Sequence, residues 1–164
     1  MSVRPQSGYT GFQIALHWLI AALVLLQLIF GESIAEAIDS NERGTPASPL
    51  DQFLADTHYW AGIAILALVA ARLWLRAVAG TPPPPQQGWM AMTAKLSHGA
   101  FYVLLIFMPI SGLLAFYIGD PYGEIHEPGK PVLIALITLH VCASLYHQLW
   151  LKDGTLRRMF VPRD

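Results

Sequence analysis

The sequence predicts an all-α integral membrane protein built as a single bundle of four transmembrane helices. Its 164 residues are 54% hydrophobic and only 13% charged, with a mean hydropathy of +0.45. A soluble domain carries about a quarter charged residues, so this chain is too apolar for that class. Its apolar residues gather in four segments of about the length that crosses a bilayer core. All six histidines lie in or beside these segments.

The first helix is predicted at about residues 12–31, because residues 14–30 contain no charged side chain. A cleavable signal peptide is the alternative, since Ala-Glu-Ala at residues 35–37 resembles a cleavage site. Only Arg4 precedes the segment as a basic charge, and a discarded peptide would have no use for His17. We therefore expect this helix to remain in the mature protein.

The other three helices are predicted at about residues 57–77, 95–118 and 128–151. In the first of these an apolar stretch is followed by two arginines, and the later two contain long runs without any charged residue. Proline fits only the first turn of a helix, so Pro128 and Pro131 predict that the last one begins near Glu127.

The connections are expected to be simple. The polar segment after the first helix predicts a short amphipathic helix from Ser33, and the run Thr-Pro-Pro-Pro-Pro-Gln-Gln-Gly at residues 81–88 predicts an extended spacer. The chain has no internal repeat and no length left for a separate soluble module. Residues 1–164 are therefore expected to form one domain.

The loop charges orient the bundle. Eight of the ten basic residues fall in the N-terminus, the second loop and the C-terminal tail: Arg4, Arg72, Arg76, Lys95, Lys152, Arg157, Arg158 and Arg163. The positive-inside rule then places both termini in the cytoplasm. Nine of the eleven acidic residues fall in the other two loops: Glu32, Glu36, Asp39, Glu42, Asp51, Asp56, Asp120, Glu124 and Glu127. The outer face is therefore expected to have a negative potential.

With this orientation, each histidine can be assigned a depth in the membrane. Ionisable side chains inside a membrane are costly and mark functional sites, although an interhelical hydrogen bond explains any single one equally well. Fourteen residues separate His126 from His140, which on one helix keeps both rings on one stripe, about 21 Å apart along the axis. The outer side receives His58 and His126, mid-span receives His140, and the cytoplasmic ends receive His17, His98 and His147.

This pattern favours haem over a transported metal ion. A zinc or copper transporter would place carboxylates or thiols in one compact cluster, whereas the predicted spans contain no acidic residue in their cores and Cys142 is best interpreted as a packing residue. An iron held by two imidazoles needs one histidine from each of two facing helices at the same depth. The pairs His58 with His126 and His17 with His140 meet this condition. Without a C-x-x-C-H motif, the two haems would be b-type.

Five stretches carry a resemblance to a known family: ALHWLIAALVL, THYWAGIAILALVAARLWLR, LSHGAFYVLLIFMPISG, HEPGKPVLIALITLHVCASLYH and LWLKDGTLRRM. In this order they resemble the bacterial cytochrome b561 family of four-helix, di-haem, quinone-linked inner-membrane proteins. The resemblance implies haem ligation by the two histidine pairs named above. It also implies electron transfer from a partner on the outer side to a quinone near the inner haem.

The resemblance suggests superoxide oxidation coupled to ubiquinone reduction as the most specific activity. The alternative is a haem-bearing anchor subunit that relays electrons between the quinone pool and a periplasmic dehydrogenase, hydrogenase or cytochrome. The outer loops are acidic here and not arginine-rich, which leaves the donor open. The expected partners are the lipid bilayer, a quinone and superoxide or another periplasmic donor. No nucleic-acid partner is expected, and a homodimer is left open.

Four further residues are predicted to bind the quinone. His98 and His147 lie at the cytoplasmic ends of their helices, where an imidazole can donate a hydrogen bond and exchange a proton near neutral pH. Lys95 and Trp150 lie at the same depth. Interfacial or propionate-binding roles are the alternatives. Arg72 and Arg76, four residues apart, are predicted to hold the propionates of the inner haem, or else to act only as positive-inside flanks.

Overall fold

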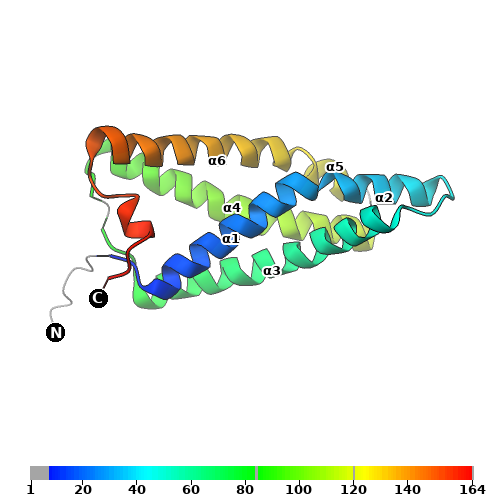
Figure 1. Ribbon diagram of the computed structural model, residues 1–164, viewed down its shortest axis with the longest axis horizontal. Helices are drawn as coiled ribbons and strands as arrows, with labels where there is room; N and C mark the ends of the chain where they lie inside the picture. Colours follow the sequence, from blue (N-terminus) through cyan, green and yellow to red (C-terminus); the bar gives the residue numbers. More distant parts are fainter. Residues whose placement is uncertain (1–7, 84, 120, 164) are drawn as a thin grey trace.

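The protein is described by a computed structural model that covers residues 8–83, 85–119 and 121–163. Arg4 and Asp120, counted above among the loop charges, lie outside the described residues. Four long helices run along a common axis (Figure 1), and short helices follow or join them. In chain order they are α1 (Gly11–Phe30), α2 (Glu32–Glu42), α3 (Pro49–Ala79), α4 (Trp89–Ile118), α5 (Tyr122–His126), α6 (Gly129–Tyr146), a π-helical turn (His147–Leu151) and a 3₁₀ turn (Arg157–Met159).

Four segments are long and apolar enough to cross a membrane: α1, α3, α4 and the stretch Tyr122–Leu151, which joins α5, α6 and the π-helical turn. The all-α architecture with four spans is therefore confirmed, and so is the short helix after the first span, which is α2. The last span is divided: α5 ends at His126 and α6 begins at Gly129, with Pro131 in its first turn. The expected helix start near Glu127 is thus close to the observed break.

Two helices begin earlier than predicted. Helix α3 begins at Pro49 and not at residue 57, because the Ser48 hydroxyl accepts a hydrogen bond from the Asp51 amide and proline occupies the first turn. Helix α4 begins at Trp89 and not at residue 95, directly after Gly88, whose φ of 64° lies in the left-handed region. The segment added to α3 contains Asp51, Gln52 and Asp56, so hydropathy alone did not mark it, whereas the segment added to α4 is separated from the uncharged run by Lys95.

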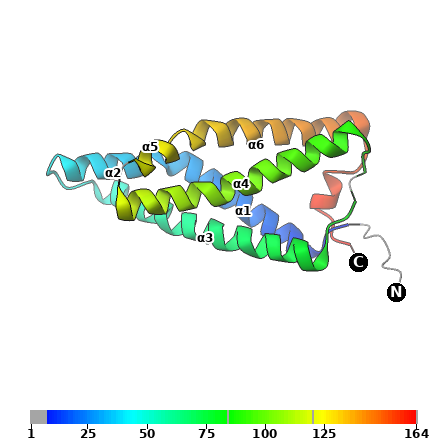
Figure 2. The same cartoon turned by 180° about the vertical axis from the view of Figure 1, so that it is seen from behind.

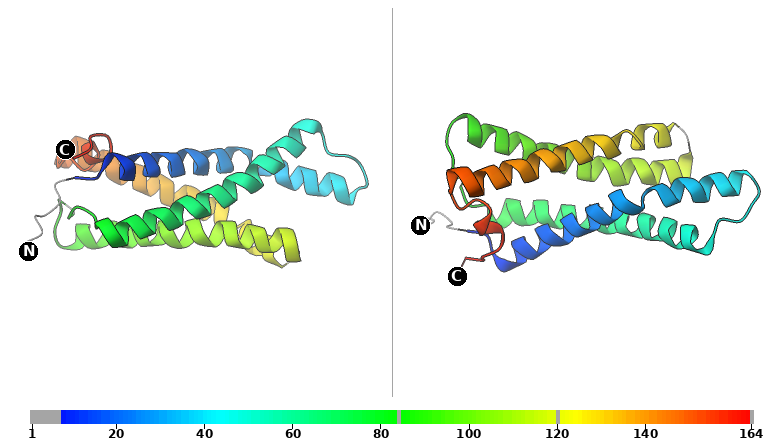
Figure 3. Two further views of the ribbon diagram at one scale, coloured as in Figure 1. Left: turned by 90° about the horizontal axis from the view of Figure 1, so that it is seen from below. Right: turned by 45° about the horizontal axis from the view of Figure 1, so that its top comes forward.

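The bundle is packed unevenly. Helix α1 packs on α3, α3 on α4, and α4 on α6, whereas α1 and α6 make hardly any direct contact (Figure 3). The buried core is correspondingly small and lies mainly between α1 and α3; it consists of Leu16, Ile20, Val24, Ile65, Val69 and Leu133. On α4 the one buried side chain is Ser111. The first and last spans are therefore joined through the middle two.

The first and last described residues, Gly8 and Arg163, lie at one end of the bundle, which we call the terminal end; the opposite end, with α2, is the α2 end (Figure 2). The tail is tied to α1 at two points. The Arg163 amide donates to the Tyr9 carbonyl at 2.9 Å, and Trp18 Nε1 donates to the Met159 carbonyl at 2.8 Å. The indole of Trp18 also packs on Phe160, with ring centroids 4.9 Å apart.

Candidate functional site

The imidazoles fall into two groups along the bundle axis. Near the α2 end, His58 of α3 faces His126 of α5 with ring centroids 6.2 Å apart and ring planes at 78°. Toward the terminal end, His98 of α4 and His140 of α6 have centroids 5.7 Å apart. His17 of α1 belongs to this second group, since its electrostatic neighbours are Arg72, His140 and His98.

The spacing of the first pair suits a shared metal. An imidazole nitrogen lies about 1 Å from its ring centre and bonds a metal at about 2 Å, so two imidazoles on opposite sides of one metal have centroids about 6 Å apart. The 6.2 Å between His58 and His126 matches this value. Among the described residues, no group of three or more histidine, cysteine or acidic side chains converges as a metal cluster would require. At the α2 end the arrangement is therefore a pair.

Ser111 fixes the ring of His126. Its hydroxyl donates to the Met108 carbonyl at 3.0 Å, so the same oxygen is left to accept from His126 Nδ1 at 3.1 Å. We infer from this network that Nδ1 carries the proton and that Nε2 has a free lone pair. A histidine that binds a metal through one nitrogen usually donates the other N–H in this way.

His58 is held through its backbone. Gln27 of α1 donates to the His58 carbonyl at 2.8 Å and so ties α1 to α3 at this level. Within the described part of the chain, His58 Nδ1 and Gln27 Oε1 are buried without a hydrogen-bond partner. An unpartnered polar atom in an apolar site costs about 1–3 kcal/mol, and the free nitrogen leaves this imidazole available to a ligand.

Gly112 leaves room for the ring of His126. A Cβ at this position would lie 3.1 Å from His126 Cε1 and 3.3 Å from Nδ1, closer than most real contacts of this kind. Gly99, on the same helix, would meet no atom within 4 Å. Only the first of these two glycines is therefore required by a neighbouring side chain.

The terminal-end group borders a small cavity of about 60 Å³ between α1, α3 and α4. Its polar lining includes Gln13, Arg72, Arg76 and His98. The guanidinium of Arg72 donates to the Gln13 carbonyl at 3.0 Å and is half-buried, whereas Arg76 is exposed. Both predicted propionate-binding arginines thus lie beside His98, and Arg72 is also an electrostatic neighbour of His17; an arginine there suits a carboxylate.

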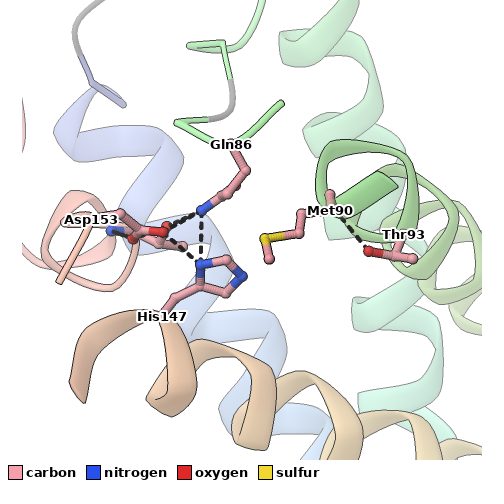
Figure 4. A network of polar contacts seen from close by, with 6 residues as sticks. Gln86, Met90, Thr93, His147 and Asp153 are labelled. Carbon is pink, nitrogen blue, oxygen red and sulfur yellow. Dashed lines mark hydrogen bonds and ion pairs between the residues drawn. The ribbon is translucent and has the colours of Figure 1, made fainter. Parts of the chain in front are cut away.

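His147 lies apart from these groups, in a polar network at the terminal end (Figure 4). Its Nδ1 is 2.6 Å from Asp153 Oδ2, which also accepts from Gln86 Nε2 at 2.6 Å. Thr155 donates to the other carboxylate oxygen through its amide and its hydroxyl. Sequence reasoning missed Asp153, Gln86 and Thr155; the one signal was an acidic residue within a largely basic tail.

The predicted quinone-binding residues are not brought together. His98 faces His140 rather than His147. Lys95 is exposed, and no hydrogen bond or ion pair joins it to either histidine within the described ranges. Trp150 stacks on Tyr146 and leaves 77% of its surface exposed. Of the four, only His147 lies in a network of partly buried polar side chains.

Comparison with known proteins places the chain in a family. The model for prokaryotic cytochrome b561 matches residues 8–162. The chain belongs to this family. It is 33% identical to cytochrome b562 of Cereibacter sphaeroides over 162 residues, which cover 98% of this chain and 100% of that protein.

Two further relatives are similar at lower identity. The probable superoxide oxidase CybB of Yersinia pestis is 29% identical over 175 aligned residues, covering 92% of this chain and 94% of that protein. Cytochrome b561 homolog 1 of Escherichia coli is 27% identical over 175 residues, covering 92% and 95%. Family membership implies haem b, transmembrane electron transfer and a membrane oxidoreductase. With the four spans, it makes the protein a multi-pass bacterial membrane protein.

Replacement of Gly112 tests the setting of His126. Since the sequence predicts His126 as an iron ligand, we expect Gly112→Ala to displace its ring by a few tenths of an ångström and to shift the electron paramagnetic resonance signal of one haem. Gly99→Ala is the matched control, because its added methyl group meets no neighbour within 4 Å. Identical spectra for both variants and the native protein would show that Gly112 does not shape a haem site.

Proposed function

We propose that this protein carries electrons through two b haems, from a donor on the periplasmic side of the bacterial inner membrane to a quinone near the cytoplasmic side. The observation that supports this most directly is the grouping of imidazoles at two levels, with His58 and His126 at the spacing of two ligands on one iron. The basic residues at the terminal end favour a cytoplasmic location for both termini.

The proposed ligands are His58 with His126 for the outer haem and His17 with His140 for the inner one. Bound haem b would supply one-electron redox chemistry, and an iron held by imidazoles suits electron transfer rather than oxygen activation. A haem held between two helices would need those helices to lie apart. Helix α1 packs on α3 and hardly touches α6, and α3 likewise makes few contacts with α5.

The same argument separates His17 from His98. The ring of His98 is only 5.7 Å from that of His140, but the two belong to α4 and α6, which pack on each other. Little space is left there for a macrocycle. We therefore assign the inner iron to His17 and His140, and place His98 at the edge of this site, beside Arg72 and Arg76.

Haem content distinguishes these assignments. We expect His17→Ala to lower the content from two haems per chain to one, because one of the two bonds to the inner iron is lost. His98→Ala should retain two. Haem per chain is measured by the pyridine haemochrome assay on purified protein. Loss of one haem from His98→Ala together with full content in His17→Ala would make His98 the ligand.

The acceptor is proposed to be ubiquinone, bound near His147. The sequence predicts His98, Lys95 and Trp150 at about the same depth in the membrane. An imidazole there can donate a hydrogen bond to a quinone oxygen and supply a proton. The terminal end also carries Gln86 and the tail, so the site would lie near cytoplasmic water.

His147→Ala should keep both haems and normal reduction from the outer side, but slow haem reoxidation by ubiquinone at least tenfold, since general acid catalysis contributes about 10²–10⁴-fold. Stopped-flow spectroscopy separates the two half-reactions. Leu149→Ala is the control, because this exposed side chain lies in the same π-helical turn. Normal reoxidation in His147→Ala would place the quinone elsewhere.

Superoxide is the most specific donor that we propose, in line with the name of the Yersinia pestis relative. The alternative is a relay role for a periplasmic dehydrogenase, hydrogenase or cytochrome. The α2 end carries Glu36, Asp51, Asp56, Glu124 and Glu127, and Arg43 there is already paired with Glu36 at 2.9 Å. Such a surface repels anions and attracts cationic proteins.

Salt dependence distinguishes the donors. If superoxide is the donor, haem reduction should become faster as ionic strength rises, because screening weakens the repulsion of the anion. A basic protein donor should show the opposite slope. The measurement is the stopped-flow rate of haem reduction by each donor from low to physiological salt. A rate with superoxide that falls with salt would contradict a negative approach surface.

A further inference from the structure

We propose that Asp153 is a positioning residue that holds His147 as the proton-delivering group of the quinone site, with Gln86 and Thr155 fixing its carboxylate. This inference rests on the proposed quinone site and adds to it the route by which protons enter. It concerns residues that lie outside the haem-ligand pairs, in the tail and in the loop between α3 and α4.

The Asp153 carboxylate receives four donors. Its Oδ2 accepts from His147 Nδ1 at 2.6 Å and from Gln86 Nε2 at 2.6 Å. Its Oδ1 accepts from the Thr155 amide at 2.9 Å and from the Thr155 hydroxyl at 2.6 Å. Burial alone would raise the pKa of this carboxyl group, but the hydrogen bonds from Thr155, His147 and Gln86 outweigh it and hold the pKa below its usual range. Asp153 therefore stays ionised throughout the neutral range.

These contacts fix the proton on the imidazole. Two acceptors would repel each other at 2.6 Å, so His147 Nδ1 must carry a hydrogen toward Asp153. Gln86 Nε2 is also 2.9 Å from Nδ1, but its two hydrogens are used by Asp153 Oδ2 and by Thr155 Oγ1 at 2.9 Å. The Nε2 edge of the ring is thus left for a ligand. In Figure 4 it points away from Asp153 and toward Met90, with Thr93 beyond.

The local backbone brings the two residues together. On a regular α-helix, positions 147 and 153 would be about 9 Å apart along the axis and on different faces. Here the chain widens into the π-helical turn His147–Leu151 and then reverses at Lys152, whose φ of 50° is left-handed. The Asp153 amide returns to the His147 carbonyl at 3.4 Å. Single π-helical turns of this kind occur frequently at functional sites.

The remaining surroundings carry no competing charge. Met90 and Gln86 face the ring from α4 and its preceding loop, and Thr93 lies beyond Met90; all three are neutral. Tyr146, the chain neighbour, has its ring centroid 6.1 Å away. Asp153 is the one charged group in contact with His147 in the described part of the chain. This carboxylate is therefore the charge that acts most directly on the ring.

The proposed proton transfer runs from the imidazolium of His147 to the quinone. Reduction of a quinone to a quinol takes two electrons, which the proposed donor supplies one at a time, and two protons. For each proton, the Nε2–H bond of the imidazolium breaks and an O–H bond forms on the quinone. The ring keeps its Nδ1–H on Asp153, and Nε2 is protonated again from cytoplasmic water. The negative carboxylate stabilises the imidazolium between transfers.

Asp153→Asn is the main test, carried out on the protein with both haems bound. The neutral side chain no longer stabilises the imidazolium. We expect ubiquinone-driven reoxidation to fall at least tenfold in kcat with little change in the KM for quinone, and its pH profile to move to lower pH. Haem content and reduction from the outer side should stay normal. Lys152→Gln is the matched control, because it removes a charge from the residue that precedes Asp153 and that residue makes no hydrogen bond to the His147 side chain.

A spectroscopic readout does not depend on turnover. Nitrogen-15 NMR of histidine-labelled native protein should show the neutral ring of His147 protonated at Nδ1, and Asp153→Asn should reduce that preference. An Nε2–H tautomer in the native protein, or an unchanged kcat and pH profile in Asp153→Asn, would overturn the inference. If His147→Ala is impaired while Asp153→Asn behaves as native, the quinone site stands and the positioning role fails. If His147→Ala itself is normal, the proposed quinone site fails.

Discussion

A polar side chain in the hydrocarbon region of a bilayer has no water to bond, and the imidazoles of this chain are subject to that constraint. The structure meets it differently at each position. His126 donates to Ser111, and His147 donates to Asp153. His58 has a buried nitrogen with no partner among the described residues. The hydrogen bonds of His126 and His147 fix the orientation of those rings, and the unpartnered nitrogen of His58 leaves that ring free to bind a ligand.

The same constraint explains why the bundle is packed so unevenly. Membrane helices associate through close packing and interhelical hydrogen bonds rather than through the hydrophobic effect. Between α1 and α3 both are present: a small apolar core that includes Ile20 and Val69, and bonds from Gln27 and Arg72 across the interface. Between α1 and α6 neither is found to a comparable extent. A group bound between these two helices would therefore add to stability, because it binds the folded state alone.

Many features of this arrangement depend on residues that are close together in the sequence, and these features can be predicted. Four long apolar segments predict the spans, and the spacing of His126 and His140 predicts two levels on the last one. The early start of α3 was missed because it depends on the Ser48 cap and not on hydropathy, and that of α4 because the helix begins directly after the left-handed Gly88. The network of His147 was missed for another reason. Gln86 lies 61 residues from His147 in the chain, and Asp153 reaches the ring only through a π-helical turn and a left-handed residue. Neither is visible in a periodic pattern.

The tail that supplies Asp153 also contacts the helix that carries His17. The ring of Trp18, adjacent to His17 and 5.3 Å from it, donates to the Met159 carbonyl, and Arg158 donates to the Pro83 carbonyl in the loop that carries Gln86. One short segment, residues 153–163, thus contacts the first helix, the α3–α4 loop and the network of His147. Electron delivery at the inner level and proton entry at the terminal end are separate chemical tasks. The same segment contacts both the helix that carries His17 and the network of His147, so displacement of the tail would disturb both sites.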